Sequence, residues 1–458
     1  MDKNKIISKL KNICFSTKKI STQDLKTKYS KIWTREGIAV FLEKDEALIF
    51  NDIIKEIFSD PVIYQNFSVS DIEKELQEII SKVLSEQMNK REEKIKNEID
   101  IFLQSINSKI KEWVFIFPIE NLKLRIRQLK LNDIILYRFT RYCANNYLKI
   151  IRNNLEQNPN YRNNRQFIDQ FVNKIKTHNV SRLLDKACAE IKIKGTLDGA
   201  RQRALRKLDI VLGIIKLFAP LGTDSAKSYF GLFGEIIPSN LRSILSYKSD
   251  KTEFHPRMER TGYLYPYEID KKKIKTMRKY GLRLLLDIEE KNEKTDLETR
   301  ILNSILWYSK AFDTPIFREI EDTRLQSDTD SISEESEFFS LGDKFLKLIV
   351  SLECLLIFGR ENKKDNISRR SSYILTDSYD QRAEIQKYLK EAYDVRSKIV
   401  HEGGYVVSRE ETRKLMLHVQ HVIITLVRFR NRWKIKNNED FYQWLEKHRL
   451  RDRLRSKR

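Results

Sequence analysis

Residues 392–407 read AYDVRSKIVHEGGYVV, and this stretch decides the fold of the C-terminal third of the chain. Apolar residues lead into it at the spacing of one helix face, and Arg396 falls on the same stripe. Gly403 and Gly404 follow His401, and glycine is common just past a helix end. We therefore expect a helix over about 380–401, with His401 in its last turn or at the break. The apolar stripe consists of Ile385, Leu389, Ala392 and Ile399.

The spacing of Arg396 and His401 recurs at Arg413 and His418. Five residues at about 100° each place two side chains roughly 140° apart on a continuous helix. The second pair lies in an uninterrupted helical pattern, so we expect its side chains to diverge. After His401 the glycines would let the backbone turn the imidazole back. An arginine on a core-facing stripe needs a partner: either a structural salt bridge or subunit contact, or a phosphate held by the forked guanidinium.

Composition favours a helical, nucleic-acid-binding protein. The chain has 458 residues, enough for two or three domains, and its 13 Gly and 8 Pro argue against an all-β fold. The formal net charge of +22 favours an anionic partner. Lysine can reflect an AT-rich genome, but arginine clusters such as ARQRALRK and KHRLRDRLRSKR do not have that explanation.

Several classes of site are not predicted. The four cysteines lie far apart without CxxC spacing, so we expect no zinc site, other metal site or disulfide framework. No GxxxxGK[ST] loop is present, and no cofactor is predicted. The N-terminus lacks the apolar segment of a signal peptide, and the apolar runs are too short to span a bilayer. We expect a cytoplasmic protein with no membrane partner.

Patterning along the chain predicts a mainly α fold with an α+β middle region. Ser70, with Glu73 three residues on, predicts a capped helix start, and the charged stretch around residues 89–98 predicts a solvated helix or a bridge. Strands are expected at 113–117, 122–129, 134–139 and 189–194, and helices at 197–219, 342–358, 380–401, 408–434 and 438–450. The expected regions are 1–110, helical; 111–268, α+β; 269–435, a helical bundle with a flexible acidic insertion at about 318–340; and 436–458, a basic helix or tail.

Three stretches of the C-terminal third resemble the HEPN superfamily (higher eukaryotes and prokaryotes nucleotide-binding), in its Apea-like branch. They are YDVRSKIVHEGG, DKFLKLIVSLECLLIFG with Glu353 at the acidic position, and ILNSILWYSKAF. The resemblance covers about 297–435. WVFIFPIENLKL and GARQRALRKLDIVLGII are similar to segments that accompany such domains in longer prokaryotic proteins. The acidic insertion departs from the family pattern.

The resemblance implies a helical bundle that dimerises and brings two Arg-x4-His motifs to one cleft. It further implies a metal-independent endoribonuclease, with His401 as general acid and base and Arg396 as stabiliser of the transition state. Cleavage by the RNA's own 2′-OH needs a group that moves protons near neutral pH and a positive charge on the phosphorane. Ser397 would hold a phosphate oxygen or orient the histidine, and Glu353 would position Arg396 or His401, or form a salt bridge within the bundle.

The predicted partners are RNA, a second copy of the chain, and a phage-derived trigger or partner protein. In this interpretation the protein is an anti-phage, abortive-infection effector that its N-terminal regions regulate. The alternatives are a non-catalytic RNA-binding or dimerisation module, or an antitoxin or scaffold for a partner enzyme. The basic tail either tracks an RNA backbone or is a solvated helix end. The predicted RNA-binding residues are Lys398, Arg449, Arg451, Arg453 and Arg455.

Overall fold

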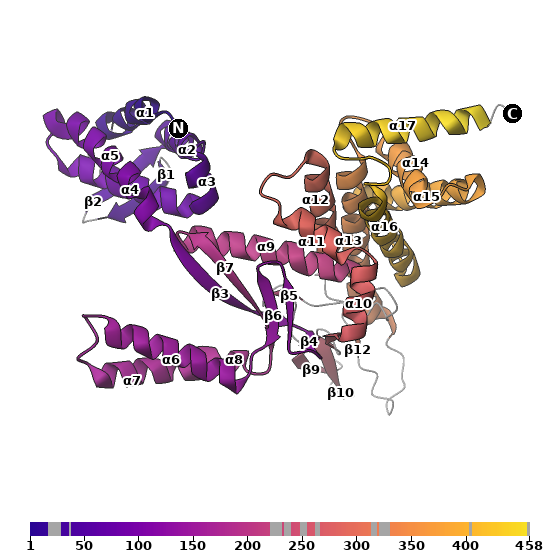
Figure 1. Ribbon diagram of the computed structural model, residues 1–458, viewed down its shortest axis with the longest axis horizontal. Coiled ribbons are helices and arrows are strands. Elements are labelled where there is room, and N and C mark those ends of the chain that lie inside the picture. The colour runs from indigo at the N-terminus through magenta and orange to yellow at the C-terminus, as the bar shows by residue number, and fades with distance from the viewer. Residues whose placement is uncertain are drawn as a thin grey trace. The chain divides into compact units, whose positions relative to one another are not determined.

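The computed structural model describes residues 1–16, 29–35, 38–219, 231–232, 240–247, 254–261, 266–312, 318–319, 330–402 and 405–455 (Figure 1). The chain forms two compact units, one of residues 1–115 with 191–207 and the other of 116–190 with 208–458. The predicted fold class, mainly α with an α+β middle region, is confirmed. Of the boundaries expected from the sequence, the first lies next to the start of a strand at Lys111, and the later two lie inside the second unit.

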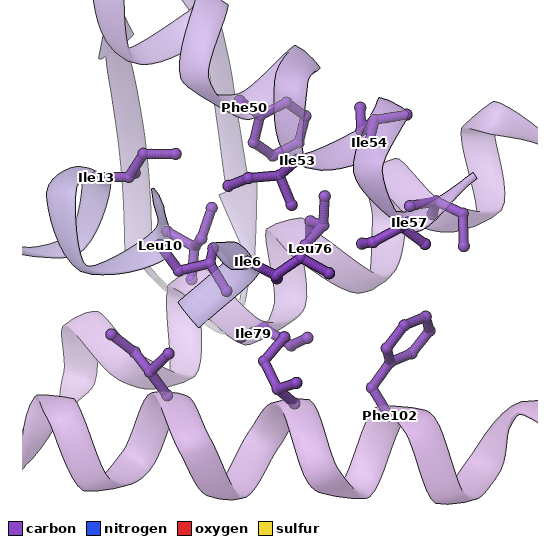
Figure 2. Packing of buried hydrophobic residues seen from close by; sticks show 14 of the residues in the cluster. Ile6, Leu10, Ile13, Phe50, Ile53, Ile54, Ile57, Leu76, Ile79 and Phe102 are labelled. Atoms are coloured by element: carbon purple, nitrogen blue, oxygen red, sulfur yellow. The ribbon is translucent and has the colours of Figure 1, made fainter. Parts of the chain in front are cut away.

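The described part of the first unit is built on the five helices α1 to α5 and a β-hairpin. The helices bury isoleucine, leucine and phenylalanine side chains against one another, among them Leu10, Ile53, Leu76 and Phe102 (Figure 2). Antiparallel pairing of β1 with β2 adds Val40 and Leu42 to the same core. The elements are α1 Lys3–Ser16, β1 Tyr29–Arg35, β2 Ile38–Glu43, α2 Lys44–Ile57, α3 Pro61–Asn66, α4 Val69–Ser85, the 3-10 turn η2 Met88–Lys90 and α5 Arg91–Lys109.

Two expectations for this unit are wrong. The N-cap of α4 is Ser68, and its capping box is closed by Asp71 rather than by Ser70 and Glu73. Thr196 also donates a hydrogen bond to Asp71, at 2.6 Å, which favours the earlier cap. The stretch expected to be solvated belongs to α5, which buries Ile95 and Ile99 in the core of the unit.

The middle region contains a five-stranded sheet of order β5-β6-β7-β3-β8. The expected strands 113–117, 134–139 and 189–194 match β3, β6 and β7, whereas 122–129 divides between β4 and β5. The long helix α9 agrees with the expected 197–219. The elements are β3 Lys111–Glu120, β4 Leu122–Leu124, β5 Gln128–Leu131, β6 Ile134–Arg138, α6 Arg141–Gln157, α7 Arg165–Ile175, the π-helix η3 Lys176–Val180, α8 Ser181–Leu183, β7 Ala187–Gly195, α9 Leu197–Phe218 and β8 Gly231–Leu232.

Shorter sheets and the eight helices α10 to α17 complete the described part of the second unit. β11 pairs with β4 in parallel, and β9, β10 and β12 form an antiparallel sheet. The C-terminal elements are β9 Asn240–Tyr247, β10 Phe254–Thr261, β11 Tyr267–Ile269, α10 Lys271–Lys279, α11 Leu282–Glu290, α12 Asp296–Lys310, β12 Arg318–Glu319, α13 Asp330–Leu356, α14 Lys363–Leu375, α15 Tyr379–Glu402, α16 Arg409–Phe429 and α17 Asn438–Arg455.

Small side chains allow the C-terminal helices to approach closely. Ser351 of α13 is fully buried and donates to the carbonyl of Ser304 on α12, at 2.7 Å. Gly342 of α13 lies next to Ile399 of α15, while Glu353 of α13 lies next to Tyr393 of α15, so these two helices run antiparallel. Helix α14 was not expected from the sequence. Of the expected acidic insertion, residues 320–329 lie outside the described residues, and from Asp330 its backbone is the first part of α13.

Candidate active site

The candidate site centres on Glu353, near the C-terminal end of α13. Its carboxylate accepts a hydrogen bond from Lys363 Nζ at 2.7 Å and one from Tyr393 Oη at 3.3 Å. Arg396 Nε lies 3.9 Å from the same carboxylate. The side chains of Glu353 and Arg396 are 13% and 26% exposed, so the pair lies at the edge of the bundle rather than in its core. The structure therefore brings together two predicted site residues, Arg396 and Glu353.

Ion pairs between α14 and α15 hold this arrangement in register. Lys364 contacts Asp394 at 2.6 Å, and Lys390 contacts Asp365 at 2.9 Å. The two contacts cross between the helices in opposite directions, so both favour the observed alignment of α14 with α15. In this alignment, Lys363 at the start of α14 and Arg396 near the end of α15 reach the same carboxylate.

The charges of the site do not cancel. One carboxylate, Glu353, serves two cations, Lys363 and Arg396, and the shorter contact goes to the lysine. The hydrogen bond that Lys363 donates to Glu353 raises the pKa of the lysine above 10.5, so it stays charged at neutral pH. Burial and the charge of Glu353 together raise the pKa of Tyr393 above 10.0, so the phenol stays neutral.

The guanidinium of Arg396 has free donors. Apart from its long contact with Glu353, its recorded contact is with the Tyr393 ring, whose centroid lies 5.6 Å from Cζ. Among the described residues no hydrogen-bond acceptor meets its terminal nitrogens. A guanidinium presents five donors, so most of this hydrogen-bonding capacity faces outward and is available to an anion.

His401 lies apart from Arg396. It is exposed in the last turn of α15, as expected, but the helix runs on through Glu402. On a continuous helix the two side chains diverge by roughly 140°. The backbone is still helical at His401 and does not turn the imidazole back there, so that expectation is wrong. Gly403 and Gly404 lie outside the described residues.

The second Arg-x4-His match also lies on a continuous helix, α16, so backbone geometry does not separate the two. Their surroundings do. His418 is half-buried and its ring lies 4.6 Å from that of Tyr388, and burial lowers its pKa below 6.5. Arg413 is exposed. His418 is thus a packed side chain, whereas His401 is accessible.

Ser397 falls on the side of α15 that carries His401. The two residues are four apart, so their side chains lie about 40° from each other. Ser397 is half-buried, and Lys398 is exposed with Nζ 5.2 Å from the centroid of the Tyr405 ring. The predicted site residues thus divide into two groups within one chain: Arg396 with Glu353, and Ser397 with His401.

The basic tail begins as helix. Arg449 of α17 is partly buried and contacts Glu446 at 2.5 Å, so part of its charge is already neutralised. Arg451 is exposed. Arg453 and Arg455 continue the helix, but their side chains lie outside the described residues.

Two residues of the site, Lys363 and Tyr393, were not predicted. Tyr393 precedes Arg396 by three positions on the same helix, a spacing that would have suggested contact. Lys363 is the first residue of α14. The sequence of this helix, residues 363–375, is polar and rich in serine, so it has no apolar periodicity that would have predicted a helix. In the described residues, no three or more metal-ligating side chains cluster, and no helix has both the length and the apolar content needed to cross a bilayer.

No protein-family model, curated protein or solved structure matches this chain.

Proposed function

We propose that the protein is an endoribonuclease whose C-terminal helices form an HEPN-type site that cleaves RNA without a metal ion. The observation that carries the proposal is the state of Arg396. It is half-buried, it lies beside a carboxylate that a lysine already neutralises, and its terminal nitrogens have no acceptor in the described chain. An accessible histidine, His401, follows at the end of the same helix.

The chemistry assigned to each side chain follows from its surroundings. The free donors of Arg396 would hold the scissile phosphate and stabilise the extra negative charge of the phosphorane. His401 would accept the 2′-OH proton and return a proton to the leaving 5′-oxygen. Glu353 keeps the guanidinium oriented, and Ser397 lies on the face of α15 where it can contact the phosphate or the imidazole.

The divergence of Arg396 and His401 supports a site shared between two copies of the chain. Within one copy the side chains point roughly 140° apart, so one phosphate cannot easily meet both. Val400 and Val406, on either side of His401, are 49% and 62% exposed. We propose that a second copy of the chain covers these valines and brings its Arg396 to this His401.

Cleavage of bulk cellular RNA in EDTA tests the proposal. We expect cleavage by the wild-type protein and its loss in Arg396→Ala and in His401→Ala, with both variants folded. Arg413→Ala and His418→Ala are the matched controls, because they carry the same spacing on α16. If the wild-type protein cleaves no RNA, either alone or after addition of phage-infected lysate, the catalytic proposal is refuted.

Mixing the two inactive variants tests the shared site. In a mixed dimer, one of the two composite sites would keep both Arg396 and His401, and the other would have neither. Activity should therefore return to up to about a quarter of the wild-type value, because half of the dimers are mixed and half of their sites are intact. A mixture as inactive as its parts would show that each site uses residues of one chain.

A second candidate is a non-catalytic HEPN module that binds RNA or joins two copies of the chain. It is favoured by the contact of Arg396 with Glu353, because a structural salt bridge within the bundle would also place an arginine beside this carboxylate. RNA binding that survives both Ala substitutions, in a protein that does not cleave, would favour this function.

A further inference from the structure

The helical hairpin of α6, α7 and η3, residues 141–180, has the surface of a nucleic-acid-binding arm. Helices α6 and α7 lie side by side and bury Ile168 and Val172 (Figure 1). Its base packs on the sheet through Ala144 and Val180, in a cluster with Phe139 and Cys188. Most other side chains of the hairpin are exposed, so little of its sequence is needed to hold the fold.

The exposed side chains of the hairpin are strongly positive. Residues 141–180 contain seven Lys or Arg and two Asp or Glu, for a net charge of +5. Both acids, Glu156 and Asp169, contact the same residue, Arg152, at 3.9 and 2.6 Å. The other six cations are exposed and make no ion pair within the described residues: Arg141, Lys149, Arg162, Arg165, Lys174 and Lys176.

Aromatic rings lie among these cations. Tyr142 is 74% exposed, and a row of rings runs from Tyr161 through Phe167 to Phe171, with centroids 5.0 and 5.9 Å apart. Tyr161 and Phe171, at the ends of this row, are each 38% exposed. The rings of this row pack on one another, but Tyr142 and the two rings at the ends of the row keep exposed surface, and exposed aromatic faces can stack on unpaired bases.

We propose that this hairpin binds single-stranded nucleic acid, with the cations contacting phosphates and the exposed rings stacking on bases. Single strands fit better than a duplex because the rings need unstacked bases. A second basic helix, α10, has six Lys or Arg among nine residues but no exposed aromatic ring, since Arg428 covers its neighbour Tyr280 at 5.6 Å. The inference stands whether or not the C-terminal site cleaves RNA.

The charge arm of the test uses the full chain and fluorescently labelled single-stranded DNA, which lacks the 2′-OH and so cannot undergo the proposed cleavage. The variant carries Lys149→Gln, Arg162→Gln, Arg165→Gln and Lys174→Gln. Each phosphate contact adds about 0.7 to the slope of log affinity against log salt, so the slope should fall by about three. At about 0.1 M salt the affinity should fall at least tenfold.

The matched control removes the same charge from α10, through Lys271→Gln, Lys272→Gln, Lys275→Gln and Arg278→Gln. Its affinity should fall much less, because only the long-range field changes. Equal losses in the two variants would overturn the assignment to the hairpin, as would failure of the wild-type chain to bind the strand. Circular dichroism of both variants checks that the fold is kept.

The stacking arm compares Tyr142→Ala with Tyr64→Ala, whose ring in the first unit is similarly exposed, at 67%. The first change should weaken single-strand binding about fivefold to a hundredfold and the second should not. Tighter binding to duplex DNA or to vesicles of anionic phospholipid than to the single strand would overturn the proposal and identify a general polyanion surface.

Discussion

Replacing Arg370 of α14 should destabilise the C-terminal bundle more than replacing Arg369, the other arginine of this helix. Its side chain is almost fully buried, and Nη1 donates to the carbonyl of Leu356 at 2.5 Å. The guanidinium also forms a two-pronged ion pair with Glu361, and Nη2 lies 2.8 Å from Oε2. Cζ lies 5.1 Å from the centroid of the Phe358 ring. One side chain thus joins α14 to the turn that follows α13.

The size of the effect can be assembled from these contacts. Breaking a buried ion pair by removing one partner costs about 3–5 kcal/mol. Glu361 is 23% exposed, so water can partly solvate the carboxylate that is left, and about 2 kcal/mol is a better figure for this pair. The unpaired Leu356 carbonyl and the lost cation–π contact add about 1 kcal/mol. Arg370→Met, which keeps an unbranched apolar stem but removes the guanidinium, should therefore lower the free energy of unfolding by about 3 kcal/mol.

Arg369→Met is the matched control. Its recorded hydrogen bond goes to Asn366 Oδ1 at 2.6 Å and it is half-buried, so the change should be within about 1 kcal/mol. Urea unfolding followed by tryptophan fluorescence is a suitable assay. Trp433 and Trp444 stack 4.4 Å apart, and α17, which carries Trp444, contacts Phe358 through Phe441. Equal destabilisation by the two substitutions would refute the reasoning.

The same pair has a pH signature. Burial alone would raise the pKa of Glu361, but the hydrogen bonds from Arg370 and the Phe358 amide outweigh it and leave the pKa below 4.5. The stabilisation is complete above pH 4.5, the ordinary value, and is lost as the pH falls through the lowered folded pKa. The difference between wild type and Arg370→Met should shrink in that acid range, and a pH-independent difference would contradict an ionic origin.

Four further substitutions probe other parts of the structure. Burial lowers the pKa of His448 below 6.5, so just below this pH the unfolded chain binds a proton that the folded chain does not. The free energy of unfolding should therefore fall as the pH drops from 6.5. Unfolding measurements at several pH values should show a weaker pH dependence for His448→Gln. Gly199→Ala should destabilise the first unit by about 1–3 kcal/mol, because the added Cβ would lie 2.7 Å from the Asn66 carbonyl oxygen. Gly342→Ala should instead stabilise α13 by about 0.5–1 kcal/mol, because the nearest atom to its added Cβ lies 3.8 Å away. Equal shifts in melting temperature for the two variants would contradict this packing. Glu353→Gln should lower the free energy of unfolding by about 1 kcal/mol because Lys363 loses its charged acceptor, and an unchanged urea midpoint would show that this contact adds no stability.

The sequence by itself determined the features that depend on near neighbours along the chain. Helical periodicity located α15 and α16 and the apolar stripe that carries Arg396, and short apolar runs between turn signals located β3 and β6. The net charge of +22 indicated an anionic partner before any contact was known. These signals are local because a helix or strand repeats its side-chain directions every few residues.

Only the tertiary structure decided which groups meet. Arg396 required a partner, but the packing of α13 against α15 determined that the partner is Glu353, and α14 determined that Lys363 shares it. The choice of Ser68 over Ser70 as a cap depends on Thr196, a residue distant in sequence. In the α6–α7 hairpin, both acidic residues contact Arg152, and this leaves the other six cations of the hairpin without an ion pair among the described residues. Charge pairing depends on distances across the fold, and a linear pattern of residue types does not contain those distances.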